Sequence, residues 1–338
     1  QSLGLYGAGQ IIGMADAGLD TGNMNTLSPD FSGRILKAYT LRRPGEWSDL
    51  NGHGTHVAGT LFGSGVLSGS DPITKNYNNS FAGIAPEAQL VFQSIGDTGD
   101  YVFPPLHLEE LFGPAYDDGA RVHNNSWGSA VGGRYTLYSR DVDKFIWDQK
   151  DFTLVFAAGN DASDKNQDGV SDKKNIFAPA TAKNCIAVGA SESERLSGGY
   201  QMGYGEAWAS SFPVSPVKYD PMSNNPFGMA AFSGRGPTED NRIKPDLCAP
   251  GTNIISARCS LPGTPTGWGV FNNHYIYWGG TSMSVPQVAG AAALVRQYYQ
   301  REKGIDPSSA LVKATLISGA VDISPGQYGT GQYREVFS

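Results

Sequence analysis

The sequence predicts an α/β fold with a mostly parallel central sheet and helices on both faces. Short apolar runs typical of buried strands alternate along the chain with longer amphipathic segments typical of helices. Glycine accounts for 44 of the 338 residues, which indicates many tight loops, while the 40% hydrophobic content is enough for a large core. No linker or shift in composition divides the chain. We therefore expect a single domain over residues 1–338.

The expected elements follow one another in the order that βαβ units require. Strands are expected at residues 10–15, 89–95, 121–127, 153–158, 185–190 and 254–257. Helices are expected at residues 53–62, 106–116, 141–149 and 307–318, and from residue 282 to a stop at residue 304. The stretch 193–227, rich in Gly, Ser, Pro and Tyr, is expected to be an insertion. Because ligands of such sheets bind beyond the carboxyl ends of the strands, we expect a site where Asp16, Ser126 and Asn160 fall.

Composition excludes several kinds of partner. Charged residues make up 17% of the chain, the net charge is −7 and no Lys/Arg-rich run occurs, so we expect no nucleic-acid partner. No apolar run is long enough to span a bilayer, and we expect no membrane contact. The residues from Gln1 onward lack the pattern of a signal peptide, so any signal or pro-segment is expected to have been removed. Cys248 and Cys259 are close enough for a small disulfide loop, but their spacing does not show whether they pair, and free thiols are the favoured expectation.

Ser282 lies in the run Gly279-Gly280-Thr281-Ser282-Met283, just before an alanine-rich helix. At a helix N-terminus, unpaired N–H groups and the helix dipole favour developing negative charge, which suits a nucleophilic serine. Pro286 fits the first turns only at a cost, because it cannot donate a hydrogen bond to the carbonyl of Ser282. The alternative is a serine that only caps the helix.

A serine nucleophile needs a base and a carboxylate that holds the base in the correct tautomer. His53 lies between two glycines, and Asp16 directly ends the first strand. Asp20 is a competing carboxylate. His56 follows His53 by one helical turn, so the pair could be metal ligands, but the glutamate and spacing of HExxH are missing. We therefore expect His56 to be a packed helix histidine.

Three ordered segments resemble the signatures of subtilases, the subtilisin-like serine peptidases. They are Asp16-Ala17-Gly18-Leu19-Asp20, His53-Gly54-Thr55-His56-Val57-Ala58-Gly59 and Gly280-Thr281-Ser282-Met283-Ser284-Val285-Pro286. The Asp, His, Ser order is that of subtilisin itself. Further matches at residues 125–128, 157–160, 232–237 and 244–251 extend the resemblance over nearly the whole chain. The pattern is nearest to bacterial alkaline subtilases whose catalytic domain is followed by a β-rich domain, which is not in this chain.

The resemblance implies a role for each matching residue. It makes Ser282 the nucleophile, His53 the general base and Asp16 the orienting carboxylate. It makes Asn160 the oxyanion-hole side chain, together with the N–H of Ser282. The edges of the pocket for the P1 side chain, the S1 pocket, would be Ser126, Trp127, Gly128, Ala157, Ala158 and Gly159, to which the substrate adds as an extra strand.

The implied activity is that of a secreted, monomeric serine endopeptidase acting on proteins or peptides through an acyl-enzyme, after loss of a pro-segment. Glycine and alanine at the pocket edges predict broad specificity favouring aromatic or large apolar P1 residues.

Three alternative functions belong to other classes of protein. A serine-carboxyl peptidase would carry a glutamate in place of His53, and an inactive binding module would usually lack a triad member. A nucleotide-binding protein would not place Asp16 and Asp20 in its phosphate turn.

A separate loop has the oxygen pattern of a calcium site. Asp164, Asn166, Asp168 and Asp172 stand at relative positions 1, 3, 5 and 9, with glycine at 6, and Val170 at 7 can offer a backbone carbonyl. Position 12 lacks the glutamate of an EF-hand, so shorter calcium loops are the nearer likeness. The alternative is a solvated acidic turn. We expect a structural Ca²⁺ that stabilises the segment after Asn160 and takes no part in the chemistry.

Overall fold

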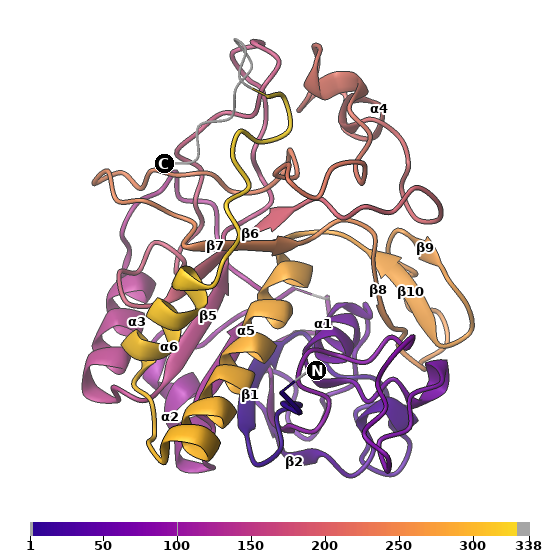
Figure 1. The fold of residues 1–338 in the computed structure, drawn as a ribbon, viewed down its shortest axis with the longest axis vertical. Coiled ribbons are helices and arrows are strands. Elements are labelled where there is room, and N and C mark those ends of the chain that lie inside the picture. Colours follow the sequence, from indigo (N-terminus) through magenta and orange to yellow (C-terminus); the bar gives the residue numbers. More distant parts are fainter. Residues whose placement is uncertain (1–2, 100, 330–338) are drawn as a thin grey trace.

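The computed structural model describes residues 3–99 and 101–329. Seven strands form one sheet in which every neighbouring pair is parallel, in the order β2-β3-β1-β4-β5-β6-β7 (Figure 1). They are β1 (Ile11–Asp16), β2 (Ile35–Thr40), β3 (Gln89–Ser94), β4 (Val122–Asn125), β5 (Thr153–Ala157), β6 (Ile186–Ser191) and β7 (Leu247–Pro250). The expectations about the chain's start at Gln1 and the domain's end at residue 338 lie outside the described residues.

Helices cover both faces of this sheet, as the sequence predicts. One face carries α1 (His53–Phe62), α5 (Thr281–Tyr298) and α6 (Ser309–Ser318), and the other carries α2 (Glu109–Asp117) and α3 (Leu137–Asp148). Successive side chains of a strand point to opposite faces, so both sets must be apolar. In β5, Val155 joins the core under α1 and α5, and Phe156 joins the core under α2 and α3.

The starts of α3 and α2 differ most from the predicted helix bounds. α3 begins at Leu137 instead of residue 141, because Thr136 and Ser139 form a capping box that satisfies its first N–H groups. α2 begins at Glu109, three residues later than predicted. After α5, a π-helical turn at Tyr299–Lys303 ends at Gly304, whose φ of 64° only glycine adopts readily. The predicted stop at Gly304 is confirmed.

Four strands escaped prediction, and one predicted strand belongs to another sheet. β2 and β7 are the edge strands of the parallel sheet. Lys37 and Thr40 interrupt the apolar pattern of β2, and β7 is only 4 residues long and ends in Pro250. The predicted strand at residues 254–257 exists as β8 (Ile254–Ala257). It pairs antiparallel with β10 (Tyr275–Trp278), which pairs with β9 (Gly269–Val270) in a separate three-stranded sheet. The βαβ interpretation of residues 254–257 was therefore wrong.

The stretch 193–227 packs with Ala190 and residues 230–232 into a small hydrophobic cluster, apart from the two cores on the faces of the sheet. It contains α4 (Tyr204–Ala207), and Tyr204, Phe212 and Met222 are buried. The Tyr204 hydroxyl donates at 2.8 Å to the buried Glu192, which immediately precedes the stretch. Figure 1 shows the α4 region at one end of the molecule, beyond β6.

Two further sequence expectations concern the cysteines and the membrane. Cys259 forms no disulfide with Cys248, and its thiol donates to the Asp49 carbonyl at 3.3 Å. In the described ranges, no helix has the length and apolar character that a bilayer crossing requires.

Candidate active site

The sheet and two helix N-termini bring the predicted catalytic residues to one edge. Asp16 is the last residue of β1, His53 the first of α1 and Ser282 the second of α5. The Asp16 Oδ1 atom lies 2.8 Å from His53 Nδ1 and also accepts the N–H of Ala17 at 2.8 Å. A carboxylate accepts only, so Nδ1 of His53 carries the proton and Nε2 is left as the base.

A buried carboxylate, Asp49, explains why α1 begins at His53. It accepts the N–H of Gly52 at 2.9 Å and both the N–H and the hydroxyl of Thr55, at 2.7 and 2.5 Å. Gly52 has a φ of 82°, which turns the chain into the helix. At Gly54, an added Cβ would lie 2.0 Å from the carbonyl oxygen of Gly18. The glycines around His53 therefore allow α1 to approach the strand end that carries Asp16.

These groups influence each other's titration. Burial favours the neutral form of His53, but the charge and hydrogen bond of Asp16, helped by Asp49, outweigh it and raise the pKa of His53. Burial, partly offset by the hydrogen bonds from Thr55, raises the pKa of Asp49 to about 6. The His53 side chain is still 22% exposed, so a substrate can reach it.

The two competing residues named from the sequence have structural roles. His56 is fully buried, and its Nε2 lies 3.1 Å from the Ile254 carbonyl. Burial lowers the pKa of His56 to about 3, so it is neutral and packed, as predicted. Asp20 accepts the N–H groups of Ser28 and Ser260, at 2.5 and 2.6 Å, and so joins two loops without contact to His53.

Two hydrogen bonds link Ser126 to Ser282. The Ser126 hydroxyl donates to the Ser282 carbonyl at 2.9 Å, and the Ser282 hydroxyl donates to the Ser126 carbonyl at 3.1 Å. The first bond satisfies the carbonyl that Pro286 cannot reach. The second means that Ser282 Oγ is turned toward Ser126 here, and rotation about its Cα–Cβ bond is needed to bring it to His53.

Asn160 is oriented as an oxyanion donor. Its Oδ1 accepts the N–H of Thr281 at 2.8 Å and the Thr281 hydroxyl at 2.9 Å. Its Nδ2 amide is therefore the free end, and neither this group nor the N–H of Ser282 donates to another group in the described part of the chain. Gly280, with a φ of 139°, keeps a side chain away from Nδ2. Two unengaged donors, Asn160 Nδ2 and the Ser282 N–H, thus both lie next to Gly280, two residues before the nucleophile.

The two predicted edges of the S1 pocket are linked by a residue that the sequence did not single out. A Cβ added at Gly159 would lie 2.3 Å from the Phe177 ring, and one added at Gly128 would lie 3.3 Å from the Phe177 Cβ. Phe177 also donates its N–H to the Ala158 carbonyl at 2.9 Å. The Phe177 side chain therefore packs against both edges, where a P1 side chain would enter.

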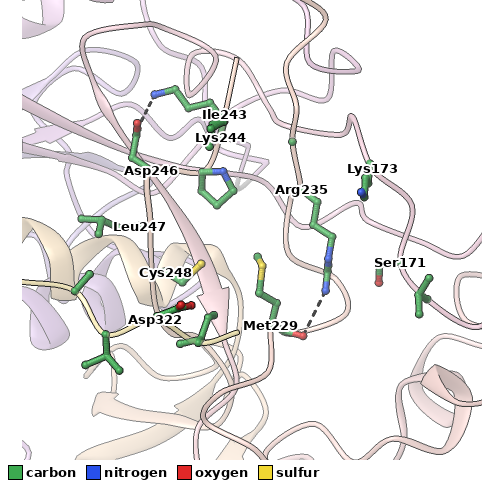
Figure 2. Close-up of a pocket in the computed structure, with 16 residues that line it drawn as sticks. Ser171, Lys173, Met229, Arg235, Ile243, Lys244, Asp246, Leu247, Cys248 and Asp322 are labelled. Atoms are coloured by element: carbon green, nitrogen blue, oxygen red, sulfur yellow. Dashed lines mark hydrogen bonds and ion pairs between the residues drawn. The ribbon is translucent and has the colours of Figure 1, made fainter. Parts of the chain in front are cut away.

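One cavity lies at the catalytic edge, and another lies near β7. A cavity of about 310 Å³ is lined by His53, Ser126 and Trp278, and the Trp278 ring meets His53 edge-on at 5.8 Å. A larger cavity of about 470 Å³ lies near β7 and contains none of the predicted catalytic residues (Figure 2). Figure 2 labels Asp246, Leu247 and Cys248 among the residues that line this cavity. Trp278 escaped prediction because β10 carried no signal beyond its aromatic residues.

The predicted calcium loop is partly ordered around its own carboxylates. Asp164 Oδ1 and Asn166 Oδ1 both accept the N–H of Asp168, at 2.9 and 3.0 Å, so these two oxygens converge. Asp172 accepts the N–H of Lys165 at 2.9 Å instead. In the described ranges, no three acidic, His or Cys side chains are close enough to hold a metal ion by themselves. Any cation here would also need the Asn166 and Val170 oxygens.

A seven-stranded parallel sheet with a serine at the start of α5 and an Asp–His pair at the ends of β1 and α1 defines the class of subtilisin-like serine peptidases. Comparison with known proteins agrees. The chain belongs to the Subtilase family, whose sequence profile matches residues 7–331.

Relatives of known description match this chain over most of its length. The chain is 28% identical over 387 residues to the serine protease/ABC transporter B family protein tagA of Dictyostelium discoideum, covering 94% of this chain and 21% of that protein. It is 26% identical over 351 residues to serine protease AprX of Bacillus subtilis (strain 168), covering 97% and 65%. It thus spans about a fifth of the length of tagA and its relatives tagB and tagD.

Two solved structures share the fold. A cold-adapted subtilisin-like serine proteinase has a TM-score of 0.56 at 22% identity, covering 93% of this chain and 83% of that chain. A mutant of the protease domain of PatA has a TM-score of 0.59 at 23% identity, covering 92% and 87%.

Proposed function

We propose that this chain hydrolyses internal peptide bonds through an acyl-enzyme on Ser282. The observation that carries the proposal is the 2.8 Å contact between Asp16 and His53 at the edge where Ser282 and Asn160 also lie. Ser282 Oγ attacks the scissile carbonyl while its proton passes to His53 Nε2, and the oxyanion is held by Asn160 and the Ser282 N–H. The C–N bond then breaks, and His53 gives the proton to the leaving amine. Water repeats the sequence to release the acid.

The test is peptide hydrolysis with and without a serine-directed sulfonyl fluoride, followed by mass spectrometry of the labelled protein. We expect loss of activity together with modification of Ser282, and neither effect in Ser282→Ala. An unreactive Ser282 in a folded protein would support the inactive binding module. Activity confined to acid and insensitive to His53→Ala would support a serine-carboxyl mechanism.

The proposed specificity is broad, with an apolar P1 residue. The predicted pocket edges carry glycine and alanine around the P1 site, and Phe177, which packs against Gly128 and Gly159, offers an apolar contact there. The same ring takes up part of the depth between the two edges. We therefore expect Phe177→Ala to raise kcat/KM for aromatic P1 residues relative to alanine by about tenfold, because it opens space for a ring. A library cleaved strictly after Lys or Arg would contradict an apolar P1 pocket.

A structural Ca²⁺ in the loop 164–172 is part of the proposal. Asp164, Asn166 and Asp168, the Val170 carbonyl and Asp172 would hold it, all through the oxygen atoms that Ca²⁺ prefers. Burial, together with the neighbouring Asp168 and Asp172 charges, raises the pKa of Asp164. A cation would offset that repulsion. Asp172 must then turn away from the N–H of Lys165.

Secretion, a cleaved pro-segment and a monomeric state are proposed from family membership. Light scattering coupled to gel filtration tests the last of these directly, and a mass well above 35.9 kDa would exclude a monomer.

A further inference from the structure

The cavity near β7 has mainly apolar walls and lies apart from the catalytic edge (Figure 2). Its volume of about 470 Å³ falls within the range of ~300–1,000 Å³ that small-molecule sites occupy. Its walls come from three parts of the chain, within residues 170–173, 229–248 and 320–323. We call it the β7 cavity and define it by the apolar side chains of Val170, Met229, Ile243, Leu247, Val321 and Ile323.

The walls of the β7 cavity are held in place by the sheet and by backbone contacts. A Cβ added at Gly189 of β6 would lie 3.1 Å from Cys248 Sγ and 3.2 Å from Met229 Cε, so glycine lets both side chains pack against the strand. The guanidinium group of Arg235, which also lines the cavity, donates to the Ala231 carbonyl at 3.0 Å. The cavity is therefore preformed by the folded chain.

Two large apolar side chains at the β7 cavity are open to water. Ile243 is 69% exposed and Val321 is 74% exposed, although they belong to distant parts of the chain. Single exposed apolar residues are common on protein surfaces. Two of them beside one apolar cavity form a surface that an apolar ligand would remove from water.

Cations outnumber anions around the β7 cavity. The charged side chains that line it are Lys173, Arg235, Lys244, Asp246 and Asp322. Asp246 is paired with Lys244 at 2.6 Å and with Lys313 at 2.8 Å, so it offers little negative charge to a ligand. Lys173 is exposed, and in the described ranges its ammonium group has no hydrogen bond or ion pair. Figure 2 shows Lys173 and Asp322 on opposite sides of the cavity. This local excess of positive charge, on a chain of net charge −7, favours an anionic group beside Lys173.

We propose that the β7 cavity binds an amphipathic anion, namely a linear aliphatic carboxylate, with its chain against Leu247 and Val321 and its carboxylate beside Lys173. The apolar walls account for the chain, because each buried methylene group contributes to binding, and the excess of positive charge accounts for the head group. The inference goes beyond the proposed peptidase activity and does not depend on it, because no residue of the catalytic edge lines this cavity.

Isothermal titration calorimetry of the wild type tests both parts of the proposal. The ligands are octanoate, decanoate, decanol and decyltrimethylammonium, used below their micelle concentrations and without added calcium. Decanoate is expected to bind about tenfold more tightly than octanoate, the effect of two methylene groups. It is expected to bind about fivefold more tightly than decanol, the upper end of what an exposed ion pair contributes, and decyltrimethylammonium is expected to bind most weakly. No saturable binding of either carboxylate would overturn the proposal.

Exposed residues of the cavity can be changed without disturbing the core. Val321→Asp is expected to weaken decanoate binding by about tenfold or more, because it replaces an apolar contact by a negative charge. Ile73→Asp is the matched control, because Ile73 is 94% exposed and does not line the cavity. Lys173→Gln is expected to bring decanoate and decanol within about twofold of each other, whereas Lys303→Gln, at an exposed lysine outside the cavity, should retain the wild-type difference. If Val321→Asp does not fold, Val321→Ser replaces it, with an expected loss of about threefold.

Cys248 reports directly on occupancy of the β7 cavity. It lines the cavity and is partly exposed, whereas Cys185 and Cys259 are buried. Burial raises the pKa of both buried thiols, that of Cys259 to about 12, which protects them from alkylation. Mass spectrometry therefore follows the reaction of Cys248 with N-ethylmaleimide. With decanoate at about ten times its dissociation constant, we expect alkylation to be about tenfold slower in the wild type, because only the empty cavity reacts.

The other outcomes each contradict a stated part of the inference. If decanoate binds equally to the wild type and Val321→Asp and inhibits peptide hydrolysis competitively, it binds at the catalytic edge and the assignment is wrong. If decanoate, decanol and decyltrimethylammonium bind equally well, the cavity does not select an anion. If Cys248 resists alkylation even without ligand, the comparison of Val321→Asp with Ile73→Asp decides the location, and equal affinities in the two variants would place the ligand elsewhere.

Discussion

The catalytic edge and the acidic loop 164–172 both collect carboxylates, but they are held in different ways. Asp16 and Asp49 are buried and fixed by a strand end and by the first turn of α1, through hydrogen bonds that close within the fold. The exposed Asp168 is held mainly by backbone and side-chain groups of its own loop. The edge is therefore preorganised by the protein alone, whereas the loop retains unbalanced negative charge that a cation could compensate.

The largest effect is expected when a catalytic side chain of the preorganised edge is removed. Ser282→Ala or His53→Ala is expected to reduce kcat by about 10⁶-fold, a magnitude measured in subtilisin itself, and the double variant to be hardly worse than either alone. The measurement is kcat on a peptide substrate, with circular dichroism to show that the fold is retained. Activity within about tenfold of the wild type in either variant would mean that these residues do not act as a unit.

A smaller loss is expected from the oxyanion donor. Asn160→Ala should lower kcat by about 10²–10³-fold with little change in KM, again the scale known from subtilisin, because the amide acts only on the transition state. It also frees the N–H and hydroxyl of Thr281, so Thr281→Val serves as a control for that lost support. An Asn160→Ala variant that changes KM alone would place Asn160 in substrate binding instead.

The pH dependence of kcat/KM tests whether the buried carboxylates of the catalytic edge act on His53 through their charge. The base must be neutral, so kcat/KM rises with pH through the His53 pKa, which Asp16 and Asp49 raise above its ordinary 6.5 despite burial. Removing one of these charges lowers that pKa. We therefore expect the acid limb of the kcat/KM profile of Asp49→Asn to shift to lower pH, measured on a substrate without titratable groups. A shift to higher pH would show that Asp49 does not act on His53 through its charge.

Much of this site could be predicted from the sequence because the sheet determines it. Once β1 ends at Asp16, parallel neighbours bring the ends of β4 and β5 to the same edge, and the glycines around His53 and Ser282 indicate close backbone approach. The positions of Phe177 and Trp278 could not be predicted. Their roles depend on contacts across distant segments and on a small antiparallel sheet with only short, weakly patterned strands.

The smallest expected effect concerns the stability of the loop and leaves the chemistry intact. If Ca²⁺ binds through Asp164, Asn166 and Asp168, chelation should lower the Tm by about 5 °C, and added calcium should restore it, because a ligand bound only to the folded state stabilises it by mass action. Asp168→Asn is expected to remove most of this difference. Val170→Ala, which keeps the backbone carbonyl, and Asp148→Asn on the exposed surface of α3 should both retain it. Protons compete for Asp164, so the calcium-dependent shift should also shrink as the pH falls. Differential scanning calorimetry with and without EGTA measures each case, and an unchanged chelator response in Asp168→Asn would show that the calcium is bound elsewhere.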